Sequence, residues 1–345
     1  MKPAFNLCNC SEVYIGSAAE LLPGLLPKGP VVVVADSTID RLYHALLAKH
    51  DAVLIGLGES VKTLQTVETI YRRFLELGVD RSTFVLAIGG GIVTDVAGFA
   101  ASTFMRGVKF GFVSTTLLGQ VDASIGGKNG VNVDGYKNMV GTFTQPQFVI
   151  CDPALLRSLP EREFRAGLAE VVKAAVIADG GLFARLEQLS FEELRRDTSL
   201  LAGIIEAAIR VKVGIVERDE KESGERRKLN LGHTLAHAIE KCSSRMNHGE
   251  AVAVGTALMA GAAVRLGLLG EEERQRIEAL LTRLGFTLTP PVEMKRLLKE
   301  VGKDKKSESG QLHVVLPVGI GACEDRKSTR LNSSHSAVSR MPSSA

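Results

Sequence analysis

The stretch Thr83-Phe-Val-Leu-Ala-Ile-Gly-Gly-Gly-Ile-Val-Thr-Asp95 carries the strongest signal for the fold. Its first part, Thr83–Ile88, is a β-branched and apolar run of the kind that forms a buried strand. Gly89-Gly90-Gly91 ends that strand and opens a helix, which we expect to run from Ile92 to about Ala101. A strand, a glycine turn and a helix in this order predict a βαβ unit of an α/β domain.

The same alternation continues on both sides of this stretch. Further strands are predicted at Val31–Ala35, Val53–Gly56 and Phe110–Ser114. A helical pattern follows the first of them, and Val61–Leu77 has apolar residues at helical spacing up to Gly78. Repeated strand and helix signals favour a mostly parallel, Rossmann-like sheet, and we assign this α/β domain to residues 1–160.

Strand signals nearly vanish after Leu159. Helices are predicted at Glu161–Ile177, Phe191–Glu217, Leu235–Cys242, Glu250–Leu266, Glu271–Leu284 and Val292–Val301. Leu312–Pro317 is the one late strand that we expect. The second domain, at residues 161–324, is therefore predicted to be mainly α-helical, and a small-molecule site is expected where two such domains meet.

The composition excludes several classes of protein. A net charge of +3 and the absence of tryptophan argue against nucleic-acid binding, which needs a concentrated basic surface or stacking aromatics. The five cysteines are odd in number and form no C-x-x-C pair, so we expect a reducing, cytoplasmic location. The small-residue run Ala251–Val264 is too short to span a bilayer, so no membrane partner is expected.

Residues 325–345 are expected to lie outside the native fold. They are polar and lack apolar periodicity, as in a disordered tail. The segment Asp325–His335 also resembles a translated sequencing-library adapter joined to a coding fragment. We therefore predict a non-native, adapter-derived tail and a missing natural C-terminus.

Two glycine-containing turns are candidate nucleotide sites. Backbone amides after Gly89-Gly90-Gly91 could approach a pyrophosphate at a helix N-terminus, although a tight turn without a ligand is the alternative. The run is not G-x-G-x-x-G, so a standard dinucleotide fingerprint is not claimed. In Gly58-Glu59-Ser60-Val61-Lys62 the acid could hold ribose hydroxyls, or the stretch is an ordinary junction.

Histidines and one buried-looking acid are candidate metal ligands. His233 and His237 are four residues apart and share one helix face, but the Glu of H-E-x-x-H is absent. Glu170 and Lys173 lie one turn apart on an apolar helix, where a simple ion pair is the alternative. His248 opens an Ala-rich helix. Three such ligands with an open position would form a catalytic rather than a structural site.

A polar, glycine-punctuated stretch could bind anions. It runs from Gln120 to Asn138 and is long for a loop without function. Basic residues follow at Lys212, at Arg226–Lys228 and at Lys303–Lys306. A solvated charged face is the alternative for such runs, and we prefer it for Arg227, Lys228 and Lys303.

From about Val31 to Pro317 the chain resembles the 3-dehydroquinate synthase family of sugar-phosphate cyclases. The resemblance is carried, in order, by Gly89–Asp95, Thr115–Asp122, Gly126-Gly-Lys128, Lys137–Gly141, Gly167–Lys173, Leu229–Thr234 and His248-Gly-Glu250. Asn129 stands where Thr is usual and Ala236 where Gly is usual. The resemblance implies a dehydroquinate synthase-like fold: an NAD-binding α/β domain and a helical metal- and substrate-binding domain.

The resemblance also implies roles for individual residues. Glu170, His233 and His248 would bind a divalent metal, zinc or cobalt, whereas His237 would serve the phosphate-elimination step. The implied NAD site comprises Gly58, Glu59, Lys62, Gly90, Gly91, Ile92, Val93, Thr94, Asp95, Thr115, Thr116, Lys128, Lys137, Leu155, Leu156, Arg157 and Ser158. The implied substrate and catalytic contacts are Arg106, Asp122, Lys128, Lys137, Asn138, Lys173, Lys212, Arg226, Asn230 and one or both of Lys305 and Lys306.

The activity implied by the resemblance is conversion of 3-deoxy-D-arabino-heptulosonate 7-phosphate to 3-dehydroquinate and phosphate, in the shikimate pathway. NAD would oxidise the substrate transiently and be regenerated before aldol cyclisation. The family also suggests a homodimer. The alternatives are a sister cyclase, such as an inosose or valiolone synthase, a metal-dependent polyol or glycerol-phosphate dehydrogenase, and an inactive relative.

Overall fold

The computed structural model describes residues 2–304 and 312–328. These residues divide into two compact units. Unit 1 comprises the chain up to Phe164 together with Thr198–Glu217, and unit 2 comprises Arg165–Asp197 and the chain from Arg218 onward. The proposed assignment of NAD binding to residues 1–160 and of metal and substrate binding to residues 161–324 stays a prediction.

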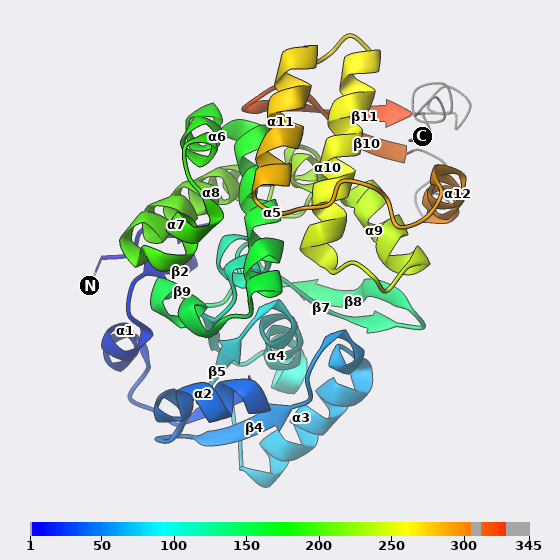
Figure 1. Cartoon of the computed structure of the whole chain (residues 1–345). Helices are drawn as coiled ribbons and strands as arrows, with labels where there is room; N and C mark the ends of the chain where they lie inside the picture. The colour runs from blue at the N-terminus through cyan, green and yellow to red at the C-terminus, as the bar shows by residue number, and fades with distance from the viewer. Residues whose placement is uncertain (1, 305–311, 329–345) are drawn as a thin grey trace. The chain divides into compact units, whose positions relative to one another are not determined.

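Unit 1 is built on a seven-stranded sheet (Figure 1). Its strands, in spatial order, are β1 (Phe5–Leu7), β2 (Ser11–Ile15), β9 (Phe148–Cys151), β6 (Phe110–Ser114), β5 (Phe84–Gly89), β3 (Val31–Asp36) and β4 (Asp51–Ile55). Only the β1–β2 pair is antiparallel. The predicted, mostly parallel α/β sheet is confirmed, whereas β1, β2 and β9 were not predicted.

Helices cover both faces of this sheet. They are α1 (Ala18–Leu25), α2 (Ser37–Leu47), α3 (Leu64–Glu76) and α4 (Gly91–Thr103), joined in unit 1 by most of α8 (Thr198–Arg218). One apolar cluster joins α1 and α2 to the side chains of Val33, Leu86 and Val113. Gly98 of α4 lies against Phe112, whose side chain projects from the opposite face. Strands buried on both faces explain the continuous apolar runs in the sequence.

The helix predicted from Val61 in fact begins at Leu64. Glu59–Val61 forms a short 3-10 turn, and Lys62 has non-helical dihedral angles. Thr63 then caps α3 by accepting a hydrogen bond from the backbone N–H of Thr66. The apolar spacing that predicted this helix therefore begins before Thr63, the residue that caps α3.

The polar stretch after Gln120 contains a hairpin that was not predicted. A π-helical turn at Gly119–Ala123 precedes β7 (Lys128–Val133) and β8 (Tyr136–Phe143), which pair antiparallel. Gly130 and Gly141 face each other, and a Cβ on either would lie within 3 Å of the opposite backbone. The glycines in this stretch thus permit close strand contact, so their presence alone does not indicate a ligand.

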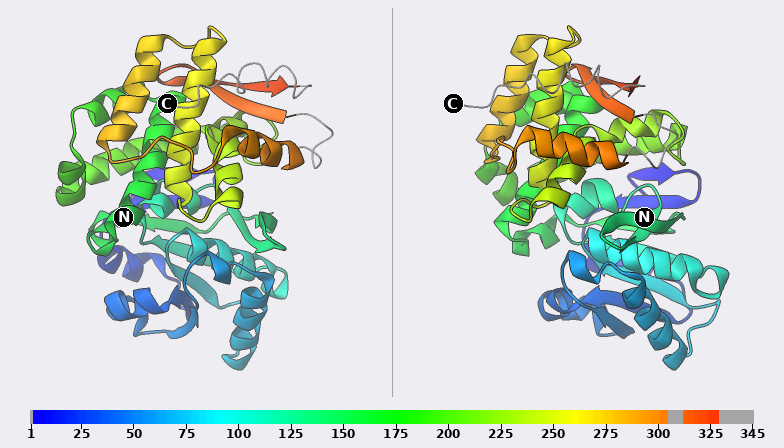
Figure 2. Two further views of the ribbon diagram at one scale, coloured as in Figure 1. Left: turned by 45° about the vertical axis from the view of Figure 1, so that its right-hand side comes forward. Right: turned by 90° about the vertical axis from the view of Figure 1, so that its right-hand side faces the viewer.

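Unit 2 is mainly helical, as Figure 2 also shows. Its helices are α5 (Glu161–Ala178), of which the residues from Arg165 belong to this unit, α6 (Gly180–Glu187), α7 (Phe191–Arg196), α9 (His233–Cys242), α10 (His248–Arg265), α11 (Glu271–Arg283) and α12 (Met294–Asp304). Within residues 2–304 and 312–328, no helix combines the length and the continuous hydrophobicity of a membrane span.

Two predictions for this part of the chain are wrong in detail. The single helix expected over Phe191–Glu217 is two helices, because Asp197 has an extended backbone between α7 and α8. The late strand, β10 (Leu312–Gly319), has an antiparallel partner in β11 (Ala322–Ser328). The start of the expected non-native tail, from Asp325 to Ser328, therefore lies in this hairpin, and its origin stays a prediction.

Candidate active site

Glu170, His233 and His248 converge within unit 2. They come from α5, α9 and α10, and one ligand atom from each lies within 4.8 Å of the other two. Oε1 of Glu170 is 3.6 Å from Nε2 of His233 and 3.3 Å from Nε2 of His248. Two ligands on a tetrahedral zinc ion with bonds near 2.1 Å lie about 3.4 Å apart. The carboxylate and two imidazoles therefore fit a zinc or cobalt ion, and three protein ligands leave a coordination position open.

Small residues bring the three helices close enough for this convergence. A Cβ on Gly249 would lie 2.3 Å from the backbone of Ala166 in α5. One on Gly255 would lie 2.1 Å from the carbonyl oxygen of Gly232, the residue that precedes α9. Gly232 has a φ of 77°, a conformation that favours glycine. Backbone contact at these points explains why the sequence around the ligands is rich in glycine and alanine.

The start of α10 is fixed by a capping box. The Asn247 side chain accepts from the backbone N–H of Glu250 at 3.0 Å, and the Glu250 carboxylate accepts from the backbone N–H of Asn247 at 2.8 Å. This interaction holds His248 at the first helical position, facing Glu170. Glu250 thus acts in the cap, and the group of possible ligands found among the described residues does not include it.

Charged and aromatic neighbours surround the ligand group. The ammonium of Lys173 forms an ion pair with Glu170, and both side chains are almost fully buried. The ring of His237 lies 5.6 Å from that of His233 and 6.4 Å from that of His248, measured between ring centres. The structure therefore brings His237 and Lys173 beside the predicted ligands.

The two histidines predicted as ligands differ in their protonation. Burial, followed by the charge of Lys173, lowers the pKa of His233 to about 3. Burial alone would also lower the pKa of His248, but hydrogen bonds and charge from Glu170 and Glu240 raise it to about 9. In the metal-free protein, a single proton beside the Glu170 carboxylate therefore belongs on His248. A cation in this place would displace that proton.

Most of the predicted nucleotide residues follow the carboxyl ends of the parallel strands β4, β5, β6 and β9 in unit 1, whereas Lys128 and Lys137 lie in the β7–β8 hairpin. Each glycine of the Gly89-Gly90-Gly91 run has a packing reason: a Cβ would collide with Val93, Thr116 or Ala123, respectively. The run alone is therefore weaker evidence for a ligand than the sequence suggested. The N-terminus of α4 nevertheless has no side-chain cap, so its first backbone amides remain available to an anion.

Polar side chains of the predicted NAD site interact with one another. Lys62 Nζ lies 2.5 Å from Asp95, and burial raises the pKa of that carboxyl despite the ammonium. Lys137 Nζ lies 3.9 Å from Glu59. Elsewhere in unit 1, Thr115 and Thr116 follow β6, Leu155–Ser158 forms a 3-10 turn after β9, and Lys128 is exposed at the start of β7.

The predicted substrate residues are held by local partners. Lys212 Nζ lies 2.5 Å from the Asp122 carboxylate in unit 1. In unit 2, the buried Arg226 side chain donates to the carbonyl oxygen of Glu220, and Asn230 donates to Glu222 at 2.6 Å. Two further residues, Arg106 and Asn138, are exposed and have positive φ angles. Lys305 and Lys306 lie outside the described residues.

Comparison with known proteins identifies the family. Residues 52–166 match the model of the 3-dehydroquinate synthase N-terminal domain, and residues 167–307 match that of the C-terminal domain. The chain belongs to the 3-dehydroquinate synthase family. It is 44% identical over 308 residues to the 3-dehydroquinate synthase of Acidithiobacillus ferrooxidans (strain ATCC 53993 / BNL-5-31), covering 86% of this chain and 85% of the relative.

This chain is also similar in structure to other sugar-phosphate cyclases whose structures have been solved. A 2-epi-5-epi-valiolone synthase from Streptomyces hygroscopicus subsp. jinggangensis 5008, solved with NAD+ and Zn2+, is 28% identical and superposes with a TM-score of 0.86 over 95% of each chain. A 2-deoxy-scyllo-inosose synthase, complexed with carbaglucose-6-phosphate, NAD+ and Co2+, is 27% identical with a TM-score of 0.81 over 90% of each chain. These similarities agree with the predicted dehydroquinate synthase-like fold.

Two residues beside the predicted sites were not predicted from the sequence. Glu240 lies 3.4 Å from Nδ1 of His248, and its position seven residues after His233 places it on the same face of α9. Asn132 contacts Glu59 in unit 1. The helical spacing of Glu240 could have indicated its role, whereas no sequence signal connects Asn132 to Glu59, because they are distant in the chain.

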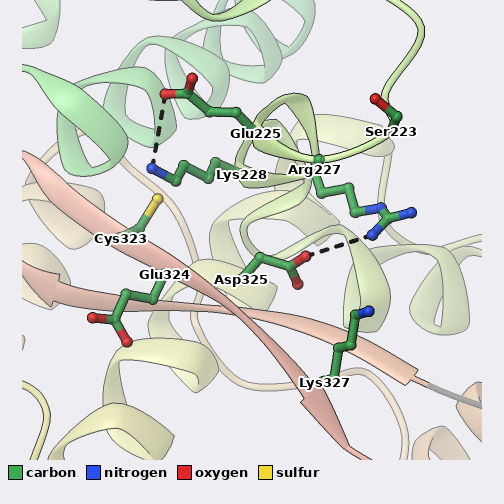
Figure 3. A pocket seen from close by; sticks show the side chains of 9 residues that line it. Ser223, Glu225, Arg227, Lys228, Cys323, Glu324, Asp325 and Lys327 are labelled. Atoms are coloured by element: carbon green, nitrogen blue, oxygen red, sulfur yellow. Dashed lines mark ion pairs between the residues drawn. The ribbon is translucent and has the colours of Figure 1, made fainter. Parts of the chain in front are cut away.

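An open pocket of about 480 Å³ lies elsewhere in unit 2 (Figure 3). Arg227 faces Asp325 and Lys228 faces Glu225 on its walls, at 4.0 and 3.8 Å. None of the predicted metal, NAD or substrate residues is among the nine that line it. The acidic and basic side chains that line it are equal in number, three of each, so it is a less suitable anion site than the predicted substrate contacts.

Proposed function

We propose that this chain is a 3-dehydroquinate synthase that converts 3-deoxy-D-arabino-heptulosonate 7-phosphate to 3-dehydroquinate and phosphate. The observation that carries the proposal is the approach of the Glu170 carboxylate to within 3.6 Å of both His233 and His248. The 44% identity to a curated 3-dehydroquinate synthase supports this choice of reaction.

We infer that the enzyme uses NAD and a divalent cation, zinc or cobalt. Glu170, His233 and His248 would hold the cation, and the residues around Glu59, the N-terminus of α4 and the 3-10 turn after β9 would hold NAD. When bound, the two cofactors would supply hydride transfer and polarisation of substrate hydroxyl groups. This assignment makes the enzyme a phosphate-eliminating carbon–oxygen lyase.

The chain's own residues would bind the anionic substrate and move its protons. Cationic side chains are suited to a phosphate and a carboxylate, and the proposed ones are Lys128, Lys137, Lys173, Lys212, Arg106, Arg226 and one or both of Lys305 and Lys306. Asp122 would orient Lys212, with which it is paired. Asn138 and Asn230 would add neutral hydrogen bonds.

His237 is the proposed proton carrier for phosphate elimination. Its ring lies beside His233 and His248 without belonging to the group of three ligands. A histidine next to a metal site can exchange a proton near neutral pH, which phosphate departure requires. Lys173 is buried against Glu170, and its positive charge would lie beside the same group of histidines.

A sister cyclase is the second candidate. It is favoured by the superposition on valiolone and inosose synthases, although their identity to this chain is lower than that of the dehydroquinate synthase. The two candidates differ in whether the substrate has a carboxylate. A buried arginine such as Arg226 is suited to bind a carboxylate, and this favours the heptulosonate phosphate.

The deciding experiment measures phosphate release from several sugar phosphates. We expect turnover of 3-deoxy-D-arabino-heptulosonate 7-phosphate with a catalytic amount of NAD, no net accumulation of NADH, and loss of activity after chelation that added zinc or cobalt restores. Turnover of only carboxylate-free sugar phosphates would replace the proposal with a sister cyclase. Stoichiometric NADH would indicate a dehydrogenase.

A further inference from the structure

Glu240 and His248 form a contact that the proposed ligand set does not explain. Oε2 of Glu240 lies 3.4 Å from Nδ1 of His248, while Nε2 of the same ring lies 3.3 Å from Glu170. The Glu240 side chain is only 7% exposed, whereas His248 is 31% exposed. A buried carboxylate thus lies on the side of the ring opposite the proposed cation.

A neutral imidazole has one N–H, and its position decides which nitrogen can bind a metal. A carboxylate at Nδ1 favours the tautomer with the proton on that atom, because it accepts the hydrogen bond. The lone pair of Nε2 then faces Glu170 and His233. Metal-binding histidines commonly donate their second nitrogen to such an acceptor, which also fixes the ring orientation.

His233 has an equivalent partner of a different kind. Its Nδ1 lies 3.2 Å from the carbonyl oxygen of Leu231, so a backbone acceptor orients this ring. The capping box at Asn247 fixes the backbone of His248 but does not fix the rotation of its more exposed ring. Glu240 therefore gives the ring of His248 the hydrogen-bond acceptor that the carbonyl oxygen of Leu231 gives the ring of His233.

We propose that Glu240 is a positioning residue that selects the metal-binding tautomer and the orientation of His248. The inference rests on the proposed metal-dependent function. Glu240 does not itself belong to the ligand group found among the described residues, so it would act through His248. The alternative is that Glu240 only stabilises the packing of α9 against α10.

Metal affinity and the spectrum of bound cobalt separate these possibilities. Metal-free full-length protein would be titrated with Co2+ against a competing chelator, and the ligand-field absorption recorded for Glu240→Ala and Glu240→Gln. Glu271→Gln is the control, because Glu271 is an exposed acid on α11 that pairs with Arg274. Circular dichroism would check that each variant is folded.

We expect Glu240→Ala to weaken Co2+ binding by roughly 10- to 100-fold and to change the absorption of the bound ion. Glu240→Gln keeps an acceptor oxygen and should recover part of the affinity, and Glu271→Gln should stay within about twofold of the unaltered protein. A packing role alone would lower the melting temperature without changing the cobalt spectrum or the affinity.

The inference is overturned if folded Glu240→Ala binds Co2+ as tightly as the unaltered protein. Should that variant not fold, Glu240→Leu, which fills the space but has no acceptor, replaces it, and unchanged Co2+ affinity and spectrum in that variant would overturn the inference. If the unaltered protein does not bind Co2+, the proposed function itself fails. The two failures are therefore distinguishable.

Discussion

The side-chain amide of Asn132 joins two parts of the predicted NAD and substrate sites. Its nitrogen donates to Oε1 of Glu59 at 2.8 Å, and its oxygen accepts from the backbone N–H of Asn138 at 2.9 Å. Asn132 also donates its own backbone N–H to the carbonyl oxygen of Lys62. Strand β8, which carries Lys137 and Asn138, is thereby tied to the acid proposed to hold the cofactor ribose.

We therefore expect Asn132→Ala to weaken both NAD binding and substrate binding. Loss of a hydrogen bond to an exposed carboxylate costs about 1.5 kcal/mol, the lower end of the usual range, which predicts roughly a tenfold rise in the NAD dissociation constant and a smaller rise in KM. Calorimetry and steady-state kinetics would measure the two effects. Asn6→Ala, at an exposed position on β1, is the matched control. Unchanged NAD affinity in Asn132→Ala would contradict the link.

Gly249→Ala should weaken the proposed metal site by forcing α10 away from α5. The added methyl group would lie 2.3 Å from the backbone of Ala166, so α10 must move away from α5 and carry His248 away from Glu170. Overpacking of this kind costs about 1–3 kcal/mol or more. We expect a lower melting temperature and weaker zinc binding, measured by thermal denaturation and chelator competition.

The control for this variant lies in the same helix. Gly261 of α10 has open space, with only the end of the Arg265 side chain near its would-be Cβ. Gly261→Ala should therefore stabilise the protein slightly, by about 0.5–1 kcal/mol, because alanine loses less backbone entropy in a helix. Equal effects of the two substitutions would show that contact between α10 and α5 does not control the site.

The loop that precedes Arg226 depends on the ionised form of Asp219. Desolvation would raise the pKa of this carboxyl, but hydrogen bonds from Ser223, Gly224 and the backbone of Arg226 lower it well below its usual range. Because the pKa is depressed in the folded state, the stabilisation is present above the unfolded pKa, near 4, and is lost as the pH falls toward the folded value.

Asp219→Ala should accordingly destabilise the protein at neutral pH. Solvent exposure limits the effect to about 1 kcal/mol, and KM should rise because Arg226 is no longer held in place. The difference in unfolding free energy between the variant and the unaltered protein should shrink below about pH 4. Denaturant titrations at several pH values would reveal it, and a difference independent of pH would exclude this origin.

The α/β domain could be predicted from the sequence because its strands are buried on both faces. Val31–Ala35 and Thr83–Ile88 are continuous apolar runs for that reason, and both were located within about one residue. The hairpin of β7 and β8 could not, because its exposed residues lack apolar alternation and its glycines serve strand contact. Local sequence patterns reflect burial, and β8 has no buried residue, while the buried residues of β7 include the polar Asn129 and Gly130.

The candidate metal site was predictable only in part. Spacing alone pairs His233 with His237, since both share a helix face, and only the family resemblance selected His248 from another helix. The convergence of α5, α9 and α10 depends on backbone contacts at Gly249 and Gly255, which no single window of sequence contains. Glu240 shares a face of α9 with His233, which is a signal in the sequence, but its partner His248 lies on the next helix.

Removal of the proposed metal ligand His233 should separate metal binding from overall stability. A ligand that binds only the folded state stabilises it by RT ln(1 + [L]/Kd), about 2.7 kcal/mol at a hundredfold excess over Kd. Zinc should therefore raise the melting temperature of the unaltered protein by roughly 5 °C, and a chelator should reverse the rise. His233→Ala should lose this response, because only Glu170 and His248 would remain as ligands.

The control substitution is His44→Ala, on the exposed surface of α2, where the side chain is 71% exposed and pairs with Asp40. It should keep the full zinc response. Glu170→Gln makes a poorer test, because it would leave the buried ammonium of Lys173 without its carboxylate and so lower stability by about 3–5 kcal/mol even without metal. A zinc-dependent rise that survives in His233→Ala would place the cation elsewhere, since two ligands do not hold zinc tightly.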